Sequence, residues 1–354
     1  MYGYAGRIII TDLSDKSIKI ERLKEEYARD FIGGKGLGAR LLWDLVKPKI
    51  DPLSPENTLI FMTGPLTGTL CPSTRMCLIS KSPLTGTFCD SYVGGHFPAE
   101  LKFAGYDAII IKGRAESPVY LWIDDDHIEI KNAKHLWGKD TFETEERIKR
   151  ELGDRTIRVG CIGPAGEKLV RFAMVNFDLY RQAGRGGLGA VMGSKNLKAV
   201  AVKGTGHVEI KDKEVFNKVA KEAFNAILES EGLYTMRRWG TGRSVTFASD
   251  EGIFPTRNWQ LETFDHADKL SGVVMEKKFW VKHKACFGCP INCGKLGVIR
   301  SGKYAGTIVE GVEYETICLL GAMCEVKDIE AVAHGNMLCD KLGLDTISTG
   351  NVIA

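Results

Sequence analysis

The sequence predicts an α+β domain followed by a mostly α-helical domain. Two observations support this. Short β-branched or aromatic runs bounded by Gly, Asp or Pro dominate the first part of the chain, and helical spacing dominates after about residue 207. The boundary is expected within residues 205–211, so that residues 1–208 form the first domain and residues 209–354 form the first part of the second.

Most of the first domain has strand character, with few helices between the strands. Helices are expected in the second half of residues 27–46 and over residues 142–152, which is too few for strict alternation of strands and helices. The expected strands cover residues 6–13, 17–23, 58–64, 76–82, 107–113, 118–132, 156–163, 170–176 and 198–204.

The second domain shows the apolar spacing of helices. Residues 212–230 place four apolar side chains along one helical face: Phe216, Val219, Ala223 and Ile227. Residues 328–343 are expected to form another helix, because they end at a glycine that suits a C-cap.

The overall composition excludes several classes of protein. The chain has 354 residues, 44% of them hydrophobic, and a net charge of +3, so nothing indicates binding to nucleic acid or to an anionic membrane. It has neither an apolar run of about 20 residues nor a signal peptide, so a cytoplasmic location is expected. Ten cysteines in such a chain favour metal binding or buried thiols over disulfides. The chain stops at what looks like the start of a new element, which suggests a fragment.

Three cysteines form the candidate metal site. Cys286, Cys289 and Cys293 have C-x2-C-x3-C spacing, and a cubane cluster or a structural zinc usually takes four ligands. An iron–sulfur cluster is favoured, and zinc remains an alternative because His283 lies nearby. Three later cysteines are in apolar or helical settings typical of buried thiols: Cys318, Cys324 and Cys339.

A glycine-rich segment forms a candidate anion site. Gly184-x-Gly186-x-x-Gly189 has the form of a dinucleotide fingerprint, but it lacks the strand before it and the full helix after it that a Rossmann turn needs. Arg181 and Arg185 flank the glycines and could bind phosphate oxygens together with backbone amides. The alternative is a tight turn with solvated arginines.

A second candidate anion site is the pair Gly94 and Gly95, which precedes a predicted helix beginning near Pro98. His96 could act there as a ligand or proton carrier, or it could cap or pack the helix. Arg75 follows a Pro-Ser-Thr turn and enters a strand, and taken alone it is typical of a surface charge.

Acidic side chains mark two further positions. Asp340 and Asp345 flank a helix C-terminus, where a carboxylate opposes the helix dipole and an amine or amidine of a ligand would compensate. The alternative for Asp345 is an N-cap. Glu310, Glu313 and Glu315 precede an apolar run. One of them could face a buried pocket and exchange protons near neutrality, or they could form an acidic first helical turn.

Together these segments resemble the aldehyde ferredoxin oxidoreductase family, the tungsten- or molybdenum-pterin enzymes of anaerobes. The shared segments recur in one order over essentially the whole chain: DPLSPENTLIF, GPLTGT, KSPLTG, AELKFAGYDAI, IGPAGEKLV, AGRGGLGAVMGSKNLKA, C-x2-C-x3-C and DKLGLDTISTG. The resemblance implies an N-terminal α+β domain, with two β-sheets that form a base under a bis-pterin tungsten cofactor. It also implies two mostly helical domains that close over the cofactor, of which this chain would hold about the first.

The resemblance also implies residue roles. Arg75 resembles the arginine between the cofactor and the cluster, and Glu315 falls where the family has an active-site glutamate. Asp340 and Asp345 match the first Asp-x-x-Gly-Leu-Asp pterin motif. Six residues resemble the loops around the pterin phosphates and their bridging Mg²⁺: Gly94, Gly95, Arg181, Gln182, Gly184 and Arg185. Three residues match three of the four 4Fe-4S ligands, with the fourth expected beyond Ala354: Cys286, Cys289 and Cys293.

The sequence departs from the family pattern at two sites. Tyr92 stands where the aldehyde-oxidising type member has an asparagine that helps to hold Mg²⁺. His334 and Met337 stand where the same member has a Glu-x-x-His motif for a metal that joins two subunits, so the resemblance does not support a metal-bridged dimer.

The implied activity is oxidation of a small aldehyde with water to a carboxylic acid. Electrons would pass through the 4Fe-4S cluster to ferredoxin, and Glu315 would activate water or take the proton. The partners could include a second copy of the chain or additional electron-transfer subunits, and the fragment alone is expected to be inactive. One alternative is the catalytic subunit of a multisubunit reductase acting on an activated acid or aromatic thioester. Another is a non-catalytic metal-binding module.

Overall fold

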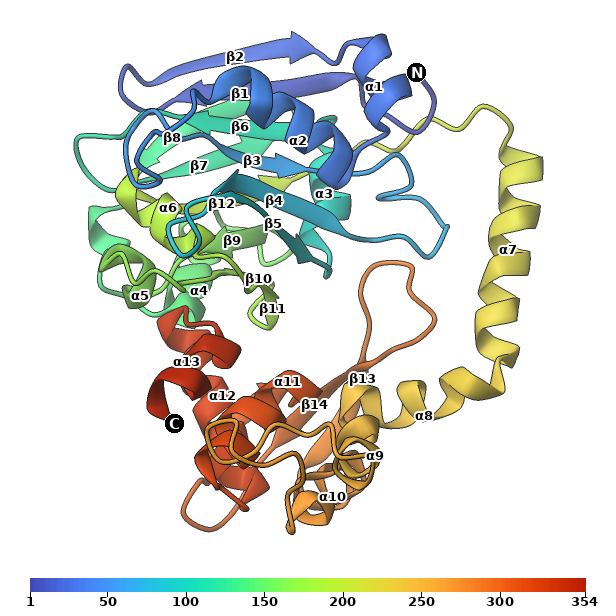
Figure 1. The fold of residues 1–354 in the computed structure, drawn as a ribbon. Coiled ribbons are helices and arrows are strands. Elements are labelled where there is room, and N and C mark those ends of the chain that lie inside the picture. The colour runs from blue at the N-terminus through green and yellow to red at the C-terminus, as the bar shows by residue number, and fades with distance from the viewer. The chain divides into compact units, whose positions relative to one another are not determined.

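The computed structural model describes all residues from Met1 to Ala354. Contacts divide the chain into two compact units, Met1–Lys221 and Glu222–Ala354, each considered by itself below. The boundary between them falls within α7 (Lys213–Glu229), a long helix that begins just after the boundary expected from the sequence (Figure 1).

Two six-stranded mixed sheets form the first unit, which confirms the expected α+β class. The first sheet has the order β2-β1-β6-β3-β4-β5 and the second has the order β11-β10-β9-β12-β7-β8. Only the β1–β6 and β7–β12 pairs are parallel. The strands of the first sheet are β1 (Arg7–Asp12), β2 (Ser17–Arg22), β3 (Leu59–Met62), β4 (Met76–Lys81), β5 (Phe88–Val93) and β6 (Ala108–Lys112). Those of the second are β7 (Val119–Asp124), β8 (His127–Asn132), β9 (Arg158–Cys161), β10 (Val175–Phe177), β11 (Arg181–Ala183) and β12 (Leu197–Lys203).

The main core of this unit lies between the two sheets and includes α3 and α6. Phe61 of β3, Phe97 of α3 and Phe177 of β10 meet there, the last two rings edge-on with centroids 4.9 Å apart. Helices α1 and α2 cover the outer face of the first sheet, and α4 covers the outer face of the second. The helices are α1 (Glu25–Phe31), α2 (Gly34–Leu45), α3 (Phe97–Phe103), α4 (Thr141–Glu151), α5 (Pro164–Glu167) and α6 (Leu188–Ser194), with a short 3₁₀ turn, η1 (Lys134–Leu136).

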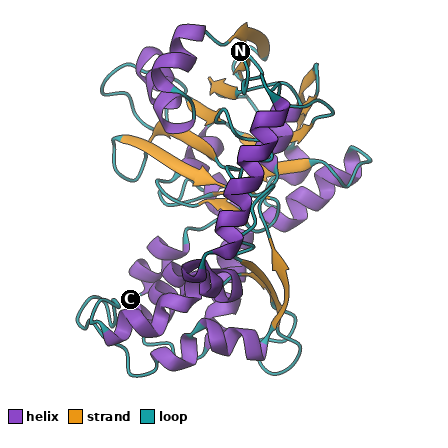
Figure 2. Cartoon of the chain, turned by 90° about the vertical axis from the view of Figure 1, so that its right-hand side faces the viewer, coloured by secondary structure: helices purple, strands orange, loops and turns teal.

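The second unit is mostly helical, as expected, but it also contains a small sheet that the sequence did not predict (Figure 2). This antiparallel sheet has the order β13-β14-β15 and comprises β13 (Trp280–Lys284), β14 (Gly294–Val298) and β15 (Ile308–Glu310). The helices are α8 (Glu231–Trp239), α9 (Val245–Asp250), α10 (Gly272–Lys278), α11 (Tyr314–Thr316), α12 (Ile329–Leu342) and α13 (Thr346–Ile353). Shorter turns are η2 (Gly240–Ser244), η3 (Ala267–Leu270), the π-helix η4 (Ile317–Gly321) and η5 (Ala322–Cys324).

Helix α12 forms where the sequence predicts it. The Asp328 side chain accepts a hydrogen bond from the Glu330 amide at its start, and Gly343 adopts a left-handed conformation at its end. The two ends therefore carry the polar cap and the glycine that the sequence pattern indicated.

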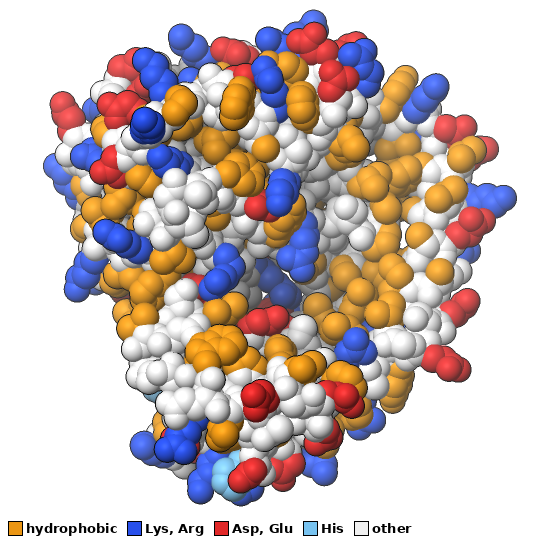
Figure 3. All heavy atoms as spheres, viewed as in Figure 1, with side chains coloured by type: hydrophobic (Ala, Val, Ile, Leu, Met, Phe, Trp, Pro, Cys, Tyr) orange, Lys and Arg blue, Asp and Glu red, His pale blue; other side chains and the backbone are white.

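Helix α7 leaves its apolar side chains exposed. Val215 and Val219 are 58% and 55% exposed, and only Ala220 is buried. Apolar and charged side chains are both visible along this helix in the space-filling view (Figure 3). No helix in the structure combines the length and the apolar character that a membrane span requires.

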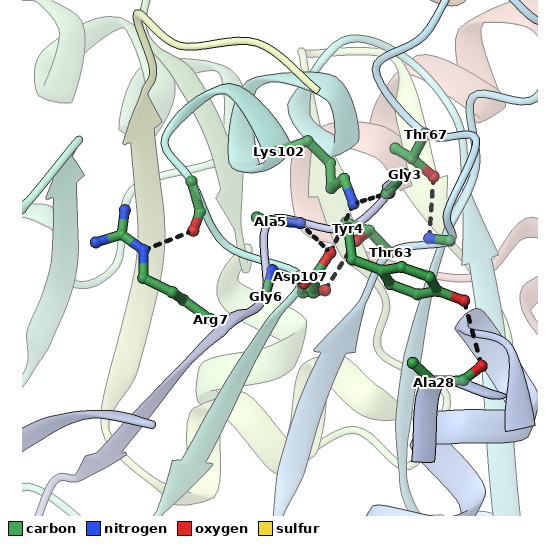
Figure 4. A network of polar contacts seen from close by, with 12 residues as sticks. Gly3, Tyr4, Ala5, Gly6, Arg7, Ala28, Thr63, Thr67, Lys102 and Asp107 are labelled. Atoms are coloured by element: carbon green, nitrogen blue, oxygen red, sulfur yellow. Dashed lines mark hydrogen bonds and ion pairs between the residues drawn. The ribbon is translucent and has the colours of Figure 1, made fainter. Parts of the chain in front are cut away.

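A fully buried ion pair fixes the N-terminal segment to the first sheet (Figure 4). Lys102 Nζ lies 2.6 Å from Asp107 Oδ1 and also donates to the Gly3 carbonyl at 2.8 Å. The Asp107 carboxylate accepts from the Ala5 amide at 3.1 Å and from the Gly6 amide at 2.7 Å. Burial lowers the pKa of Lys102, while the adjacent Asp107 acts to raise it. Each buried charge therefore depends on its partner.

We expect Asp107→Ala to lower the free energy of unfolding by about 3–5 kcal/mol, because it leaves the Lys102 ammonium buried and unpaired. Urea unfolding checks this. Asp126→Ala is the matched control, since Asp126 pairs with Arg7 but its side chain is 79% exposed, and its loss should cost no more than about 1 kcal/mol. Equal losses in the two variants would contradict the prediction.

Candidate functional site

The first part of the site lies where β4 begins and β5 ends. Met76 pairs with Val93 in this antiparallel ladder, so Arg75 and Gly94, the next residues along each strand, lie beside one another. The Arg75 side chain is exposed, and its carbonyl accepts a hydrogen bond from the Thr67 hydroxyl at 3.1 Å. Arg75 is thus held at the sheet edge next to the Gly-Gly turn.

The Gly-Gly turn contacts the hairpin formed by β10 and β11. Gly95 has φ +87°, and a Cβ there would lie 2.7 Å from Asp178 Oδ2 and 3.0 Å from Arg181 Cγ. Only glycine accommodates both this backbone conformation and this approach. The turn therefore brings Gly95 against Arg181, a residue distant in the sequence.

The Gly-Arg loop after β11 rests on β5. The Arg185 amide donates to Ser91 Oγ at 3.1 Å, and Ser82 Oγ donates to the Gly186 carbonyl at 2.7 Å. Gly186 has φ +81°, and a Cβ there would overlap Cys89 Sγ. The loop has room only for a glycine at this contact.

The structure thus brings together the candidate residues of the first unit at one edge of the two sheets. Arginines beside tightly turning glycines are typical of anion-binding loops, so the donor groups present here fit a ligand that carries phosphates. A Cβ placed on Gly184 would have Gln182 Cβ as its nearest neighbour, 4.0 Å away, so this part of the loop is open. The residues are Arg75, Gly94, Gly95, Arg181, Gln182, Gly184 and Arg185.

The loop is not a Rossmann turn, in agreement with the sequence analysis. The strand before it, β11, has three residues and pairs antiparallel with β10, and the helix after it, α6, has seven residues. A dinucleotide turn requires a parallel βαβ unit with a full helix.

Tyr92, which replaces the expected carboxamide, lies on β5 beside this edge. Its side chain is partly exposed and pairs in register with Cys77. Burial, and next the neighbouring Cys77, raise the pKa of Tyr92, so the phenol stays neutral at physiological pH. A neutral phenol is a poorer ligand for Mg²⁺ than an amide oxygen.

In the second unit, the three cysteines of the candidate metal site lie in the connection between β13 and β14. Lys284 pairs with Gly294 at the base of this hairpin, and the Cys289 amide donates to the Cys286 carbonyl at 3.2 Å. All three thiols are partly exposed. No group of three or more His, Cys, Asp or Glu side chains in the structure is arranged to hold a metal ion. The donor chemistry of Cys286, Cys289 and Cys293 fits an iron–sulfur cluster, but their thiols do not form a ready metal site.

The three later cysteines have the surroundings expected of packed thiols. Burial raises the pKa of both Cys318 and Cys339 to about 12, so neither is a thiolate at neutral pH. Cys324 donates to the Leu319 carbonyl at 3.4 Å. None of the three resembles an activated ligand.

Asp340 and Asp345 are both buried and have protein partners. Asp340 Oδ2 accepts from Asn336 Nδ2 at 2.8 Å on α12. Asp345 caps α13, since its carboxylate accepts from the Ile347 amide at 3.0 Å and from Ser348 Oγ at 2.7 Å. Asp345 therefore has the N-cap role that was one of the two alternatives from the sequence. Asp340 lies near the end of α12 and Asp345 at the start of α13, so the two carboxylates are on neighbouring helices.

Glu315 lies in the first turn of α11 and is exposed. The buried position of this turn is taken by Thr316, so within its own unit Glu315 does not face a buried pocket. Of the two alternatives from the sequence, the placement of Glu315 within its unit corresponds to an acidic first helical turn. The π-helix η4 follows directly, a deviation often found at functional sites.

His334 is engaged within its own unit. Its Nδ1 lies 2.9 Å from Thr307 Oγ1, and its ring packs against Tyr304 with centroids 5.4 Å apart. Met337 lies one helical turn further along α12. These contacts give His334 a packing role.

Sequence reasoning missed two residues that hold the first site together, Ser91 and Asp178. Ser91 was missed because β5 was not predicted, although its residues alternate between buried and exposed positions. Asp178 gave only the weak signal of an Asp in a loop before Arg181. Its contact with the Gly-Gly turn depends on the tertiary fold.

Comparisons with known proteins find similarity along nearly the whole chain. The N-terminal domain of aldehyde ferredoxin oxidoreductase matches residues 8–204, and domains 2 and 3 of the same family match residues 218–354. The tungsten-containing aldehyde ferredoxin oxidoreductase of Pyrococcus furiosus is 46% identical over 359 residues, covering all of this chain and 58% of that protein. That of Thermococcus kodakarensis is 45% identical with the same coverage.

Two relatives belong to larger assemblies by name. The WOR-like subunit of the aliphatic sulfonate oxidoreductase of Pyrococcus furiosus is 38% identical, covering all of this chain and 59% of that protein. A solved structure, the active site complex BamBC of benzoyl coenzyme A reductase, matches with a TM-score of 0.87 at 30% identity, covering 99% of this chain and 55% of that chain. The chain thus spans less than two thirds of the relatives it matches. Because both models of this family match it and it is 46% identical to one of these enzymes, the chain belongs to the aldehyde ferredoxin oxidoreductase family of oxidoreductases.

Proposed function

We propose that the complete protein is a tungsten-pterin oxidoreductase that oxidises an aldehyde to a carboxylic acid. One observation carries the proposal: the Gly94–Gly95 turn and the Arg181–Arg185 segment converge at one sheet edge as a surface suited to phosphates. Identity of 46% to a tungsten-containing aldehyde ferredoxin oxidoreductase supports the choice of cofactor and substrate class.

In this proposal the first unit is the base that holds the cofactor. Arg181 and Arg185 would bind pterin phosphates, and backbone amides of the Gly94–Gly95 turn would complete the contacts. Arg75, beside Gly94, would contribute a positive charge to the cofactor site. Mg²⁺ would help to neutralise the phosphates, and because Tyr92 stands in place of a carboxamide, main-chain carbonyls would serve as its protein ligands.

The second unit carries the other candidate ligands. Asp340 and Asp345 would accept hydrogen bonds from the amino groups of a pterin, since each is a buried carboxylate near the end of a helix. Cys286, Cys289 and Cys293 would provide three thiolate ligands of a 4Fe-4S cluster.

The bound tungsten pterin would supply the two-electron chemistry, while the protein orients the aldehyde and moves protons. Oxidation of an aldehyde with water to a carboxylic acid releases two protons and two electrons. Glu315, carried by α11, would accept one of the protons from the attacking water, and the second would pass to solvent. A bound 4Fe-4S cluster would supply one-electron transfer to ferredoxin as the acceptor of both electrons.

The direct test is an assay of the complete protein under anaerobic conditions, with a set of aldehydes as donors and ferredoxin or a low-potential dye as acceptor. We expect formation of the matching carboxylic acid with two electrons transferred per aldehyde. Absence of acid with every aldehyde, in protein that contains the cofactor, would contradict the proposal.

A second candidate is the catalytic subunit of a multisubunit reductase acting on an activated acid or aromatic thioester. The BamBC structure favours it, because it covers 99% of this chain with a TM-score of 0.87. Purification from the native source distinguishes the two. A protein that copurifies with further iron–sulfur subunits and reduces an aromatic thioester would support this candidate.

The phosphate contacts give a separate prediction. We expect Arg181→Ala combined with Arg185→Ala to lower the pterin and tungsten content of the complete protein at least about tenfold, because two charge-assisted contacts of about 1.5–3 kcal/mol each are lost. Metal analysis and pterin release check this. Arg150→Ala is the control, since that arginine is 75% exposed on α4, and full cofactor loss in the control would contradict the assignment.

A further inference from the structure

Asp178 lies in the tight connection between β10 and β11, with its side chain only 9% exposed. Its Oδ2 accepts hydrogen bonds from the His96 amide at 2.7 Å and from the Phe97 amide at 3.1 Å. These amides open α3, and His96, at the N-cap position, makes no side-chain capping bond. Asp178 therefore caps a helix that is distant from it in the sequence.

The same carboxylate lies beside both halves of the proposed phosphate site. The position of a Cβ on Gly95 lies 2.7 Å from Asp178 Oδ2 and 3.0 Å from Arg181 Cγ, so the three residues occupy one small space. Phe177 pairs with Arg181 across the hairpin, so Asp178 is the first residue of its turn. One side chain thus joins the Gly94–Gly95 turn to the arginine hairpin.

The backbone around Asp178 is held in an uncommon conformation from outside the turn. Asp178 and Leu179 have φ of +47° and +66°, a region that costs non-glycine residues free energy. The Leu179 amide donates to Glu145 Oε2 at 2.9 Å, and the Leu179 carbonyl accepts from Asn176 Nδ2 at 2.8 Å. Contacts from α4 and β10 therefore fix the direction of the Asp178 carboxylate.

The charge of Asp178 is only partly compensated. Its Oδ1 is buried without a hydrogen-bond partner, and the nearest basic group, Arg158 Nη1, lies 3.9 Å away. Burying a carboxylate costs free energy unless hydrogen bonds or an ion pair compensate for the lost water. The side-chain hydrogen bonds that Asp178 accepts come from the two amides that follow the Gly-Gly turn.

We infer that Asp178 is a positioning residue for the cofactor site. By holding the His96 and Phe97 amides, it fixes the Gly94–Gly95 turn at a set distance from Arg181, so that amides and guanidinium can meet the same phosphates. It does so without touching the ligand. The inference rests on the proposed function for the identity of that ligand, but the coupling of the two loops can be tested without it.

The experiment compares Asp178→Ala and Asp178→Asn in the complete protein with Asp212→Ala. Asp212 is a matched control because its Oδ1 accepts from the Val215 amide at 3.0 Å at the start of α7, and α7 makes none of the contacts described for the Asp178 turn. The readouts are pterin and tungsten content, thermal midpoint, and amide hydrogen exchange of peptides spanning residues 91–97 and 181–187 in cofactor-free protein.

We expect Asp178→Ala to reduce cofactor content about tenfold, which corresponds to about 1.4 kcal/mol, and to speed exchange in both peptides. Asp178→Asn should restore most of the content, because its amide oxygen can accept the same two bonds. Asp212→Ala should lower the thermal midpoint at most, without either effect.

Two results would overturn the inference. If Asp178→Ala speeds exchange only at residues 96–97 and leaves cofactor content unchanged, Asp178 is a helix cap and no more. If asparagine gives no rescue, the carboxylate does not act through the two amides.

If the wild-type protein contains no pterin, the proposed function fails, and the exchange of the 181–187 peptide still decides whether Asp178 couples the two loops.

Discussion

Glu315→Gln in the complete protein is expected to abolish most turnover while the cofactor and cluster stay at wild-type levels. Glutamine keeps the size and hydrogen-bonding reach of the side chain but cannot accept a proton, and general-base catalysis contributes about 10²–10⁴-fold to a rate. Because Glu315 is exposed in the first turn of α11, the substitution removes no buried contact within its unit. Stability should therefore change little.

The assay is steady-state aldehyde oxidation, with metal and pterin content measured on the same samples. Glu325→Gln is the control, since that side chain is 61% exposed in the same unit and pairs only loosely with Arg257. Near-normal turnover in Glu315→Gln, or an equal loss in Glu325→Gln, would remove Glu315 from the proposed proton transfer.

Cys289→Ser is expected to remove most of the iron from the complete protein and with it electron transfer to ferredoxin. Cys289 lies in the middle of the β13–β14 connection, between the two other proposed ligands. A serine hydroxyl is a far weaker ligand for iron than a thiolate, so the cluster should not assemble. Tungsten should be less affected, because the proposed phosphate contacts lie in the first unit.

Iron analysis and the electron paramagnetic resonance signal of the reduced protein check this prediction. Cys324→Ser is the matched control, because Cys324 is a partly buried thiol of the same unit whose bond to the Leu319 carbonyl serine can also make. Wild-type iron content in Cys289→Ser would show that the cluster, if present, lies elsewhere.

Much of the first unit could be predicted because its central strands are short apolar runs with clear ends. β4 and β6 are buried on both faces, and their sequences read as continuous apolar runs. The run over residues 118–132 was predicted as one strand but forms the β7–β8 hairpin, because Asp125 takes a left-handed turn conformation within it.

Other strands could not be predicted, because they form only by pairing with neighbouring strands and their own sequences show no strand pattern. β11 has only three residues and exists through its ladder with β10. The β13–β15 sheet includes the charged strand Trp280–Lys284, which has no apolar alternation. Such strands form because neighbouring segments supply their hydrogen bonds.

The residue types of the candidate site could be predicted, but their convergence could not. Arg181 and Gly95 are far apart in the sequence and meet because β5 and β10–β11 end at one edge, where Asp178 joins them. The residue types of the Gly-Arg segment predicted an anion site, and the family resemblance implied that its ligand is a pterin phosphate. Exposure of Glu315 likewise follows from how α11 packs, which a cluster of acidic residues does not specify.

Metal analysis of the complete protein, purified without oxygen, is the decisive measurement for the proposed cofactor and cluster. We expect tungsten or molybdenum at about one atom per chain, together with about four iron atoms held mainly by cysteine thiolates. Zinc alone, with neither tungsten nor molybdenum and no iron, would contradict this expectation and leave a metal-binding module in place of an oxidoreductase.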